Sequence, residues 1–459
     1  MLEGFIAEHR TRMVSTLQEL LQIPSVEGAY VPGQPFGKDA ADALKYVLNL
    51  ASEFGFIVAN VDGYAGHVEF GSGDEYVAVL SHLDVVPAGT NWTSPAFAAE
   101  IRDGKIYARG AIDDKGPALS TLWALIGLKQ MGYTPKRKIR LVFGLDEESG
   151  WKCVEHYFAK QPLPLGGFTP DADFPLIHAE KGAATVRIEV PADDKSMNPR
   201  VLSFDGGERS NMVPDLATAI VDCHSETAAS EWEQKLHKEA RTRDYNVRLS
   251  VSGAHIEIAV SGTSAHGSTP DLGVNAITRL AALLATQSVS NASMWRAISI
   301  LDTHGKSLGI DSSDEVTGHL TSNLGRAYLD EGKYVFLINI RYPIHKTSTE
   351  LLSSIQQTMS DKWSIEIAGD KAPLYVPLDH PVVSVLSDVY QKLTGQPAIP
   401  LAIGGATYAR AIPNAVAFGP LFPNQADLAH QADENWAIDD YLRCIEIYAH
   451  AMLELANTL

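Results

Sequence analysis

Short apolar runs typical of strands alternate with amphipathic runs typical of helices over residues 1–150. The pattern predicts helices over 2–22, 39–54 and about 117–131. Such alternation indicates an α/β sheet with helices on both faces. In these sheets functional residues gather at the carboxyl ends of the strands. The predicted strands are 56–61, 66–70, 76–81, KIYARG and KRKIRLVFGL.

The chain of 459 residues is longer than one hydrophobic core usually supports, so two compact units are expected. From about residue 182 the strands and helices become shorter, with one helix predicted over 273–288. The earlier pattern returns with a helix over 381–394 and a final helix from about 436 to 457. We predict an α/β domain with a mixed sheet flanked by helices, formed by 1–181 and 381–459. An inserted α+β domain over 182–380 interrupts it.

Composition narrows the class of protein. A net charge of -19 argues against nucleic acid as a partner, because phosphate binding needs clustered Lys and Arg. No run of apolar residues is long enough to span a membrane, and no signal peptide is visible. Cys153, Cys223 and Cys444 are scattered, which excludes a thiolate metal site and predicts a reducing, cytoplasmic location.

Three polar segments follow predicted strands: SHLD at 81–84, DD at 113–114 and EE at 147–148. His82 and Asp84 face the same side of an extended segment, so Asp84 is placed to orient the imidazole. Paired carboxylates that are buried together repel each other unless cations compensate them. Each segment alone is more typical of a turn or a solvated surface. Together, at three strand ends, they favour a metal site.

Several longer stretches carry a family resemblance. The sequence resembles the zinc peptidases and deacylases that include the aminoacylases and glutamate carboxypeptidases. Within that family it is most similar to the PepV-type, carnosinase-like dipeptidases. The stretches run from residue 81 to 435 and are SHLDVVPAG, ARGAIDDKGP, GLDEESG, PDADFP, SAHGSTP, INIRYP, GGATYAR and LAHQADEN.

The resemblance implies a two-metal centre. Asp113 would bridge the two ions, with a cis peptide between it and Asp114. Zinc is the default, and Mn or Co fits the same nitrogen and oxygen ligands. Glu147 would bind no metal and act as the general base. One ion would be held by His82, Asp113 and Asp171, and the other by Asp113, Glu148 and His430.

Further residues are implied to contact the substrate. His266 would stabilise the oxyanion, Arg341 would form a fork with a free carboxylate, and Asn211 is a weaker candidate. Backbone groups at Gly405 and Thr407 would receive the same carboxylate end.

Three further positions lie in or near these stretches. GGATYAR departs from the family's GGGTYAR at Ala406, which puts backbone freedom there in doubt. Asp173 is either a grip for a free amine or part of a surface turn. His178 is interpreted as a structural neighbour.

The leading hypothesis is a di-metal dipeptidase, and the alternative with the same chemistry is an N-acyl-amino-acid deacylase. Simple deacylases of the family carry a shorter lid and dimerise through it. The long insertion resembles a doubled lid of ferredoxin-like halves, so we expect a monomer that acts on small dipeptides. A third hypothesis, a non-catalytic metal-binding scaffold, would predict loss of the base, whereas Glu147 is present.

Overall fold

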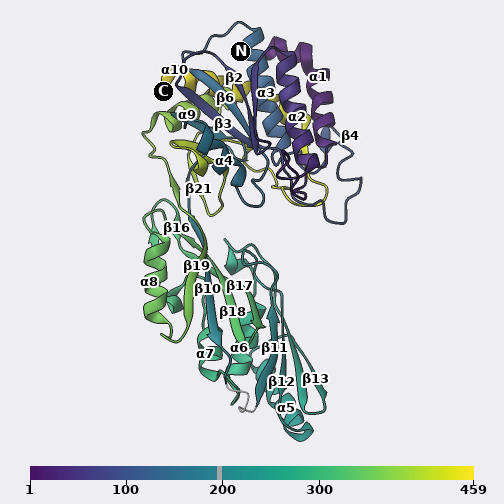
Figure 1. The fold of residues 1–459 in the computed structure, drawn as a ribbon, viewed down its shortest axis with the longest axis vertical. Coiled ribbons are helices and arrows are strands. Elements are labelled where there is room, and N and C mark those ends of the chain that lie inside the picture. Colours follow the sequence, from purple (N-terminus) through teal and green to yellow (C-terminus); the bar gives the residue numbers. More distant parts are fainter. Residues whose placement is uncertain (194–198) are drawn as a thin grey trace. The chain divides into compact units, whose positions relative to one another are not determined.

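The computed structural model describes residues 1–193 and 199–459. The described chain forms two compact units (Figure 1). The first comprises 1–179, 375–402 and 407–459, and the second comprises 180–374 and 403–406.

A nine-stranded mixed sheet organises the first unit. Its centre is parallel, because β3 pairs in parallel with both β6 and β7, and β7 pairs in parallel with β22. Nearly every residue of β3 and β6 is buried, as expected for strands covered on both faces. The strand order is β1 (Ile57–Val61), β2 (Ala65–Phe70), β6 (Lys138–Gly144), β3 (Tyr76–His82), β7 (Gly166–Thr169), β22 (Ala415–Ala417), β9 (Ile177–Glu180) and β20 (Leu374–Tyr375), with β21 (Leu401–Ile403) paired to β9.

Helices cover both faces of this sheet. A Cβ on Gly66 would meet Leu44 and Leu48 of α2, whereas the next side chain along β2, His67, contacts Tyr157 of α4. Neighbouring residues of a strand point to opposite faces, so α2 and α4 lie on opposite sides. The helices of this unit are α1 (Glu3–Leu21), α2 (Lys38–Glu53), α3 (Lys115–Gln130), α4 (Lys152–Lys160), α9 (Pro381–Thr394) and α10 (Ile438–Thr458).

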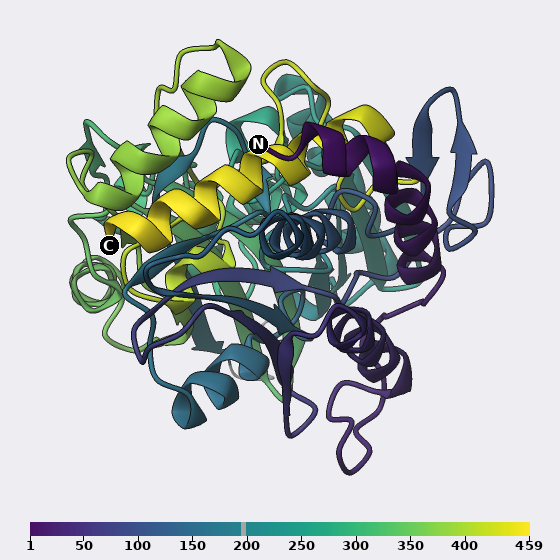
Figure 2. The ribbon, with the colours of Figure 1, turned by 90° about the horizontal axis from the view of Figure 1, so that it is seen from above.

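Helix α3 is buried on almost every side, from Lys115 to Leu128. It packs against α1, α10, β3 and β6. The purple α1 and the yellow α10 also contact each other (Figure 2). The start of α3 is therefore held rigidly beside the ends of the two central strands.

A small three-stranded sheet corrects one expectation. The KIYARG strand, β5 (Lys105–Tyr107), belongs to the order β24-β5-β4 and not to the central sheet. Asp113 therefore reaches the site from the start of α3 and not from the end of a central strand. The other members of the small sheet are β4 (Glu100–Arg102) and β24 (Asn435–Ala437).

The second unit is built on an eight-stranded antiparallel sheet. Burial alternates along β10, so that one face packs against helices and contributes to the core of this unit. Its helices are α5 (Glu226–Thr242), α6 (Ala276–Ala285), α7 (Ala292–Ser299) and α8 (Ser348–Thr358). The strand order is β13 (Val247–Ser252), β14 (His255–Ser261), β12 (Leu216–Asp222), β11 (Arg200–Gly206), β17 (Thr321–Asp330), β18 (Lys333–Tyr342), β10 (Gly182–Pro191) and β19 (Ser364–Lys371).

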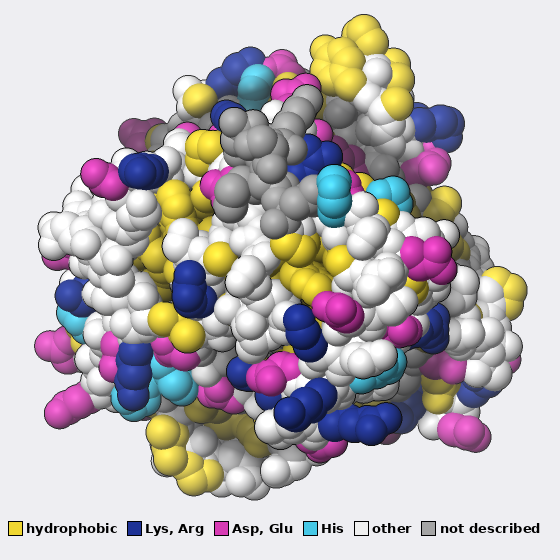
Figure 3. All heavy atoms as spheres, turned by 90° about the horizontal axis from the view of Figure 1, so that it is seen from below, with side chains coloured by type: hydrophobic (Ala, Val, Ile, Leu, Met, Phe, Trp, Pro, Cys, Tyr) yellow, Lys and Arg dark blue, Asp and Glu magenta, His cyan; other side chains and the backbone are white. Residues whose placement is uncertain are grey.

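The predicted fold class is confirmed: an α/β unit with a mixed sheet is interrupted by an α+β unit. Among the described helices, none combines the length and the apolar character needed to cross a membrane. On the face seen from below, Lys and Arg side chains are interspersed with Asp and Glu (Figure 3).

His67 gives the first unit a specific pH dependence. Burial, followed by the charge of Arg140, lowers the pKa of His67 from 6.5 to about 4. Unfolding restores the higher pKa, so the unfolded chain binds more protons between these values and stability falls as the pH decreases from 6.5 to 4. We expect His67→Gln to flatten this part of the stability curve, measured by denaturant unfolding at several pH values. The exposed His255→Gln change serves as a control. Equal slopes in wild type and His67→Gln would contradict the assignment.

Candidate metal centre

Five segments of the first unit bring their polar side chains to one edge of the central sheet. His82 ends β3, and the 146–148 segment follows β6. Asp171 follows β7, and Asp113 precedes α3. The last part comes from far along the chain, since His430 lies in the segment before β24.

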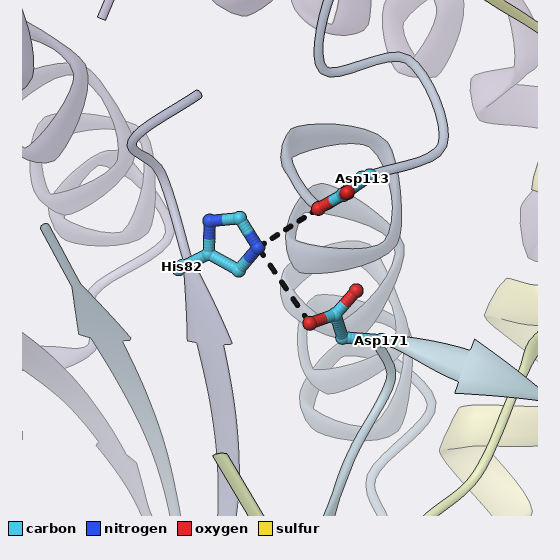
Figure 4. Close-up of side chains that lie close together, drawn as sticks. All are labelled: His82, Asp113 and Asp171. Carbon is cyan, nitrogen blue, oxygen red and sulfur yellow. Dashed lines mark hydrogen bonds and ion pairs between the residues drawn. The ribbon is translucent and has the colours of Figure 1, made fainter. Parts of the chain in front are cut away.

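The imidazole of His82 is fully buried and faces two carboxylates (Figure 4). Its Nε2 lies 3.0 Å from Oδ1 of Asp113 and 3.6 Å from Oδ2 of Asp171. Its Nδ1 donates to the backbone carbonyl of Asp84 at 2.8 Å. In the neutral tautomer that this bond selects, the lone pair of Nε2 faces the carboxylates and is available to a metal.

Asp84 holds the two ligand segments together, in a way that differs partly from the expectation. The backbone oxygen of Asp84 is the closer acceptor for His82, whereas its Oδ1 lies 3.4 Å from Nδ1. Its Oδ2 accepts a hydrogen bond from the backbone N–H of Glu148 at 3.0 Å. Asp84 therefore orients the imidazole mainly through its main chain, and fixes the Glu148 segment through its side chain.

Asp113 stands between two imidazoles. Its Oδ1 lies 3.0 Å from Nε2 of His82, and its Oδ2 lies 3.0 Å from Nε2 of His430. His430 also lies 2.9 Å from Oε1 of Glu148. One carboxylate with an oxygen directed to each of two nitrogen ligands has the arrangement of a bridging ligand.

The ligand atoms fall into two groups, each of which can hold a metal ion. In both groups the candidate atoms lie within 4.8 Å of one another. Neither group includes Glu147, so this carboxylate stays available for proton transfer. The first group is His82, Asp113 and Asp171, and the second is Asp113, Glu148 and His430.

The pKa values reveal uncompensated negative charge. Burial, and then the Asp113 carboxylate, raises the pKa of both Asp171 and Glu148. Burial also raises the pKa of Glu147 well above its ordinary range; neighbouring carboxylates raise it further, while His82 lowers it. Crowded, partly buried carboxylates of this kind fit a site made for cations.

The two imidazoles respond in the opposite direction. Asp113, and then Glu148, accept hydrogen bonds from protonated His430 and raise its pKa to about 11. Burial lowers the pKa of His82, but Asp113, Asp171 and Asp84 more than offset it and raise that pKa well above 6.5. The neighbouring carboxylates thus stabilise the positively charged form of each imidazole. They would stabilise a bound metal cation in the same way.

Asp114 supports the centre without joining either ligand group. The peptide between Asp113 and Asp114 is cis, as the resemblance implied. The fully buried side chain of Asp114 accepts a hydrogen bond from the backbone N–H of His82 through Oδ2 at 3.0 Å. Asp114 therefore ties the start of α3 to the end of β3.

The remaining candidates, apart from Thr407, lie in the second unit. Asn211 and His266 are neighbours there, since the carbonyl of Asn211 accepts a hydrogen bond from the N–H of Gly267 at 2.7 Å. The backbone N–H of Ser268 donates to Nδ1 of His266 at 3.2 Å. In a neutral imidazole the proton then resides on Nε2, which is the tautomer that can donate to an oxyanion.

Arg341 is largely buried on β18, and its side chain is oriented by two contacts. Its Nε donates to Oδ1 of Asn339 at 3.1 Å, and its Nη1 donates to the carbonyl of Gly404 at 3.1 Å. Gly404 directly precedes Gly405, so Arg341 and the glycine-bearing segment lie together as a candidate carboxylate grip.

Several predicted positions have plain structural roles. The side chain of Thr407, in the first unit, accepts a hydrogen bond from the N–H of Ala409 and so caps the short helical turn that follows it. The backbone of Ala406 stays out of the left-handed region, so its conformation does not require glycine. The buried His178 donates through Nδ1 to the carbonyl of Val376 at 2.9 Å. Asp173 lies in a short strand, β8 (Ala172–Asp173), where burial and then Asp427 raise the pKa of its carboxyl.

Sequence reasoning missed the residues that hold these segments in place. Asp146 accepts hydrogen bonds from the N–H groups of Gly150 and Lys152 and so shapes the turn that carries Glu147 and Glu148. The buried Asn323 donates to the carbonyls of Ser210 and Met212, on either side of Asn211. The short spacing within DEESG could have suggested a turn, but Asn323 has no local signal.

Comparison with known proteins places this geometry in a family. Residues 78–454 match the model for peptidase family M20/M25/M40. A putative dipeptidase, YtjP, of Bacillus subtilis is 41% identical in an alignment of 457 residues that covers 97% of each chain. The Beta-Ala-Xaa dipeptidase of Lactobacillus delbrueckii subsp. lactis is 34% identical over 456 residues, covering 97% of this chain and 96% of the relative.

Solved structures share the fold at low sequence identity. Human carnosine dipeptidase 1 superposes with a TM-score of 0.59 at 15% identity, covering 99% of this chain and 98% of that one. The dipeptidase Dug1p of Saccharomyces cerevisiae also gives a TM-score of 0.59 at 15% identity, with 99% and 97% coverage. The family match spans most of the chain and includes every segment of the candidate centre. The chain therefore belongs to peptidase family M20/M25/M40.

Proposed function

We propose that this peptidase hydrolyses dipeptides at a centre of two divalent cations, with Glu147 as the general base. The observation that carries the proposal is the position of Asp113, whose two oxygens lie 3.0 Å from His82 and His430 respectively. A preference for dipeptides is supported by the names of relatives that are similar over nearly the whole chain.

Cations bound by the two ligand groups would polarise the scissile carbonyl and acidify an attacking water. The protein supplies the proton path. Glu147 accepts the proton of the water and returns it to the leaving amine. We propose that His266 donates to the developing oxyanion through Nε2 and that Arg341 binds the free carboxylate of the dipeptide.

The two alternative hypotheses are less well supported. An N-acyl-amino-acid deacylase would use the same centre, but the relatives with full-length similarity carry dipeptidase names. A non-catalytic scaffold would have no need of Glu147, a partly buried acid outside both ligand groups.

We propose zinc as the cation, because imidazole and carboxylate ligands suit it, with Mn or Co as substitutes. We propose that the protein works as a monomer. The eight-stranded sheet of the second unit fits a doubled lid, which would supply within one chain what a partner subunit supplies in a dimer. A cytoplasmic location agrees with three free and buried cysteines.

Cation binding should stabilise the first unit. At a concentration one hundred times the Kd, a divalent cation that binds only the folded state adds about 2.7 kcal/mol to the free energy of unfolding. We expect zinc to raise the melting temperature of the wild type and chelation to reverse the rise. Asp113→Asn should lose most of the response, whereas Asp103→Asn, at an exposed turn, should keep it. An undiminished rise in Asp113→Asn would contradict the bridging role.

Glu147→Gln separates metal binding from catalysis. The amide cannot accept a proton from water, so kcat should fall about 10²–10⁴-fold, while the metal content measured by atomic absorption stays at the wild-type value. Glu155→Gln, on the exposed face of α4, is the matched control and should leave kcat unchanged. Turnover by Glu147→Gln at the wild-type rate would rule out this residue as the base.

Arg341→Met tests the carboxylate grip. A hydrogen-bonded charge pair is worth about 1.5–3 kcal/mol, so KM for a dipeptide should rise about 10–100-fold. The KM for the corresponding dipeptide amide should change little. Arg187→Met, which removes a guanidinium from the same sheet, should have no effect on either substrate. An equal change in KM for the dipeptide and its amide would show that Arg341 does not bind the carboxylate.

A further inference from the structure

A buried ion pair contacts both of the segments that carry Asp113 and His430. Nη1 of Arg109 donates to Oε2 of Glu434 at 2.6 Å. The two side chains are 2% and 1% exposed. Desolvation offsets much of the attraction in such a pair, so stability alone is a weak reason for its presence.

Glu434 holds the backbone of the proposed bridging ligand. Its Oε1 accepts hydrogen bonds from the N–H groups of Ile112 at 3.0 Å and Asp113 at 3.4 Å. Its Oε2 is the oxygen bound by Arg109. Both oxygens of this carboxylate are therefore engaged, one by the Asp113 segment and one by the guanidinium.

Arg109 extends the connection to two other ligand segments. Its Nη1 also donates to the carbonyl of Gln431, next to His430, at 3.3 Å. Its Nη2 donates to the carbonyl of Ala88, in the segment after His82, at 3.4 Å. The planar guanidinium can make these bonds together because its donors have fixed directions.

The small sheet provides the frame for these contacts. Asn435 pairs with Tyr107, and the N–H of Ala108 donates to the carbonyl of Glu434 at 3.1 Å. The 107–113 and 430–435 segments are thus held side by side, although more than three hundred residues separate them in sequence. The side-chain contacts then determine how Asp113 faces His430.

We propose that the Arg109–Glu434 pair is the positioning unit of the two-cation centre. It fixes the Asp113 main chain relative to the His430 and His82 segments, so that the carboxylate can serve both ligand groups. Neither residue contacts the reacting atoms. This inference rests on the proposed function, because positioning matters only if Asp113 and His430 bind cations.

The test is a cobalt(II) titration of the full chain, with Kd and stoichiometry from visible absorption and equilibrium dialysis. The variants are Arg109→Met, Glu434→Gln and the double change. Each single change leaves a buried group without its charged partner and should lower the melting temperature. The double change removes both charges and should recover part of that loss. Residues that support metal ligands typically contribute 10–100-fold in affinity, so the double variant should still bind at least one cobalt ion about 10–100-fold more weakly.

A matched control separates positioning from general stability. Glu69 forms another buried pair with Arg140, with 12% and 7% exposure, on the central sheet of the same unit. Glu69→Gln should lower the melting temperature but leave the cobalt Kd and stoichiometry unchanged. A cobalt Kd that changes as much in Glu69→Gln as in the double variant would overturn the proposal.

Two further outcomes are decisive. If the double variant binds two cobalt ions with wild-type affinity, the pair does not position the centre. Arg109→Lys, which keeps the charge but not the fork, carries the same test if the double variant does not fold, and it should also weaken cobalt binding. By contrast, a wild type that binds no cobalt, or a His430→Ala variant that binds two ions as tightly as wild type, would refute the proposed centre itself.

Discussion

Negative charge concentrated at one edge of a buried sheet is the constraint on which the rest of the centre depends. Asp113, Asp171, Glu147 and Glu148 meet there, and burial together with mutual repulsion raises the pKa of all but Asp113. The two imidazoles, His82 and His430, can compensate only part of this negative charge. Such a cluster is compatible with a stable fold when cations complete it, and in the proposed function the same cations would supply the chemistry of peptide hydrolysis.

The fold solves a geometric problem, which is to bring together ligands from distant parts of the chain. Parallel strands β3, β6 and β7 direct three segments to the same edge. The start of the buried helix α3 adds Asp113. His430 arrives through the pairing of β24 with β5. Polar side chains that bind no cation then connect these segments, as Asp84 and Asp114 do through backbone N–H groups.

Much of this architecture could be predicted from sequence, because periodicity reports burial directly. The strand ending at His82 and the helices at both ends of the chain were expected within one or two residues of their observed bounds. The helix expected over 273–288 is shorter, since Asn275 caps it by accepting hydrogen bonds from the N–H groups of Ile277 and Thr278. A cap inside a helical pattern is difficult to detect when apolar residues lie on both sides of it.

The supporting contacts could not be predicted in the same way. In the sequence, nothing distinguishes Arg109 and Glu434 from exposed charged residues. Only the tertiary structure shows that they are buried together. The placement of β5 outside the central sheet was also missed, because a short strand carries no information about its partner. Asp84 was expected to orient His82 through its side chain, whereas its main-chain oxygen makes the shorter contact. Local patterns thus identify candidate ligands, but the way in which they are held depends on long-range pairing.

The most direct measurement is anomalous X-ray diffraction from crystals of the protein grown with zinc, collected at the zinc absorption edge. We expect two anomalous peaks roughly 3.5–4 Å apart, with Asp113 between them. One peak should lie within bonding distance of His82 and Asp171, and the other within bonding distance of Glu148 and His430. A single peak, or peaks that do not share Asp113 as a ligand, would contradict the proposed two-cation centre.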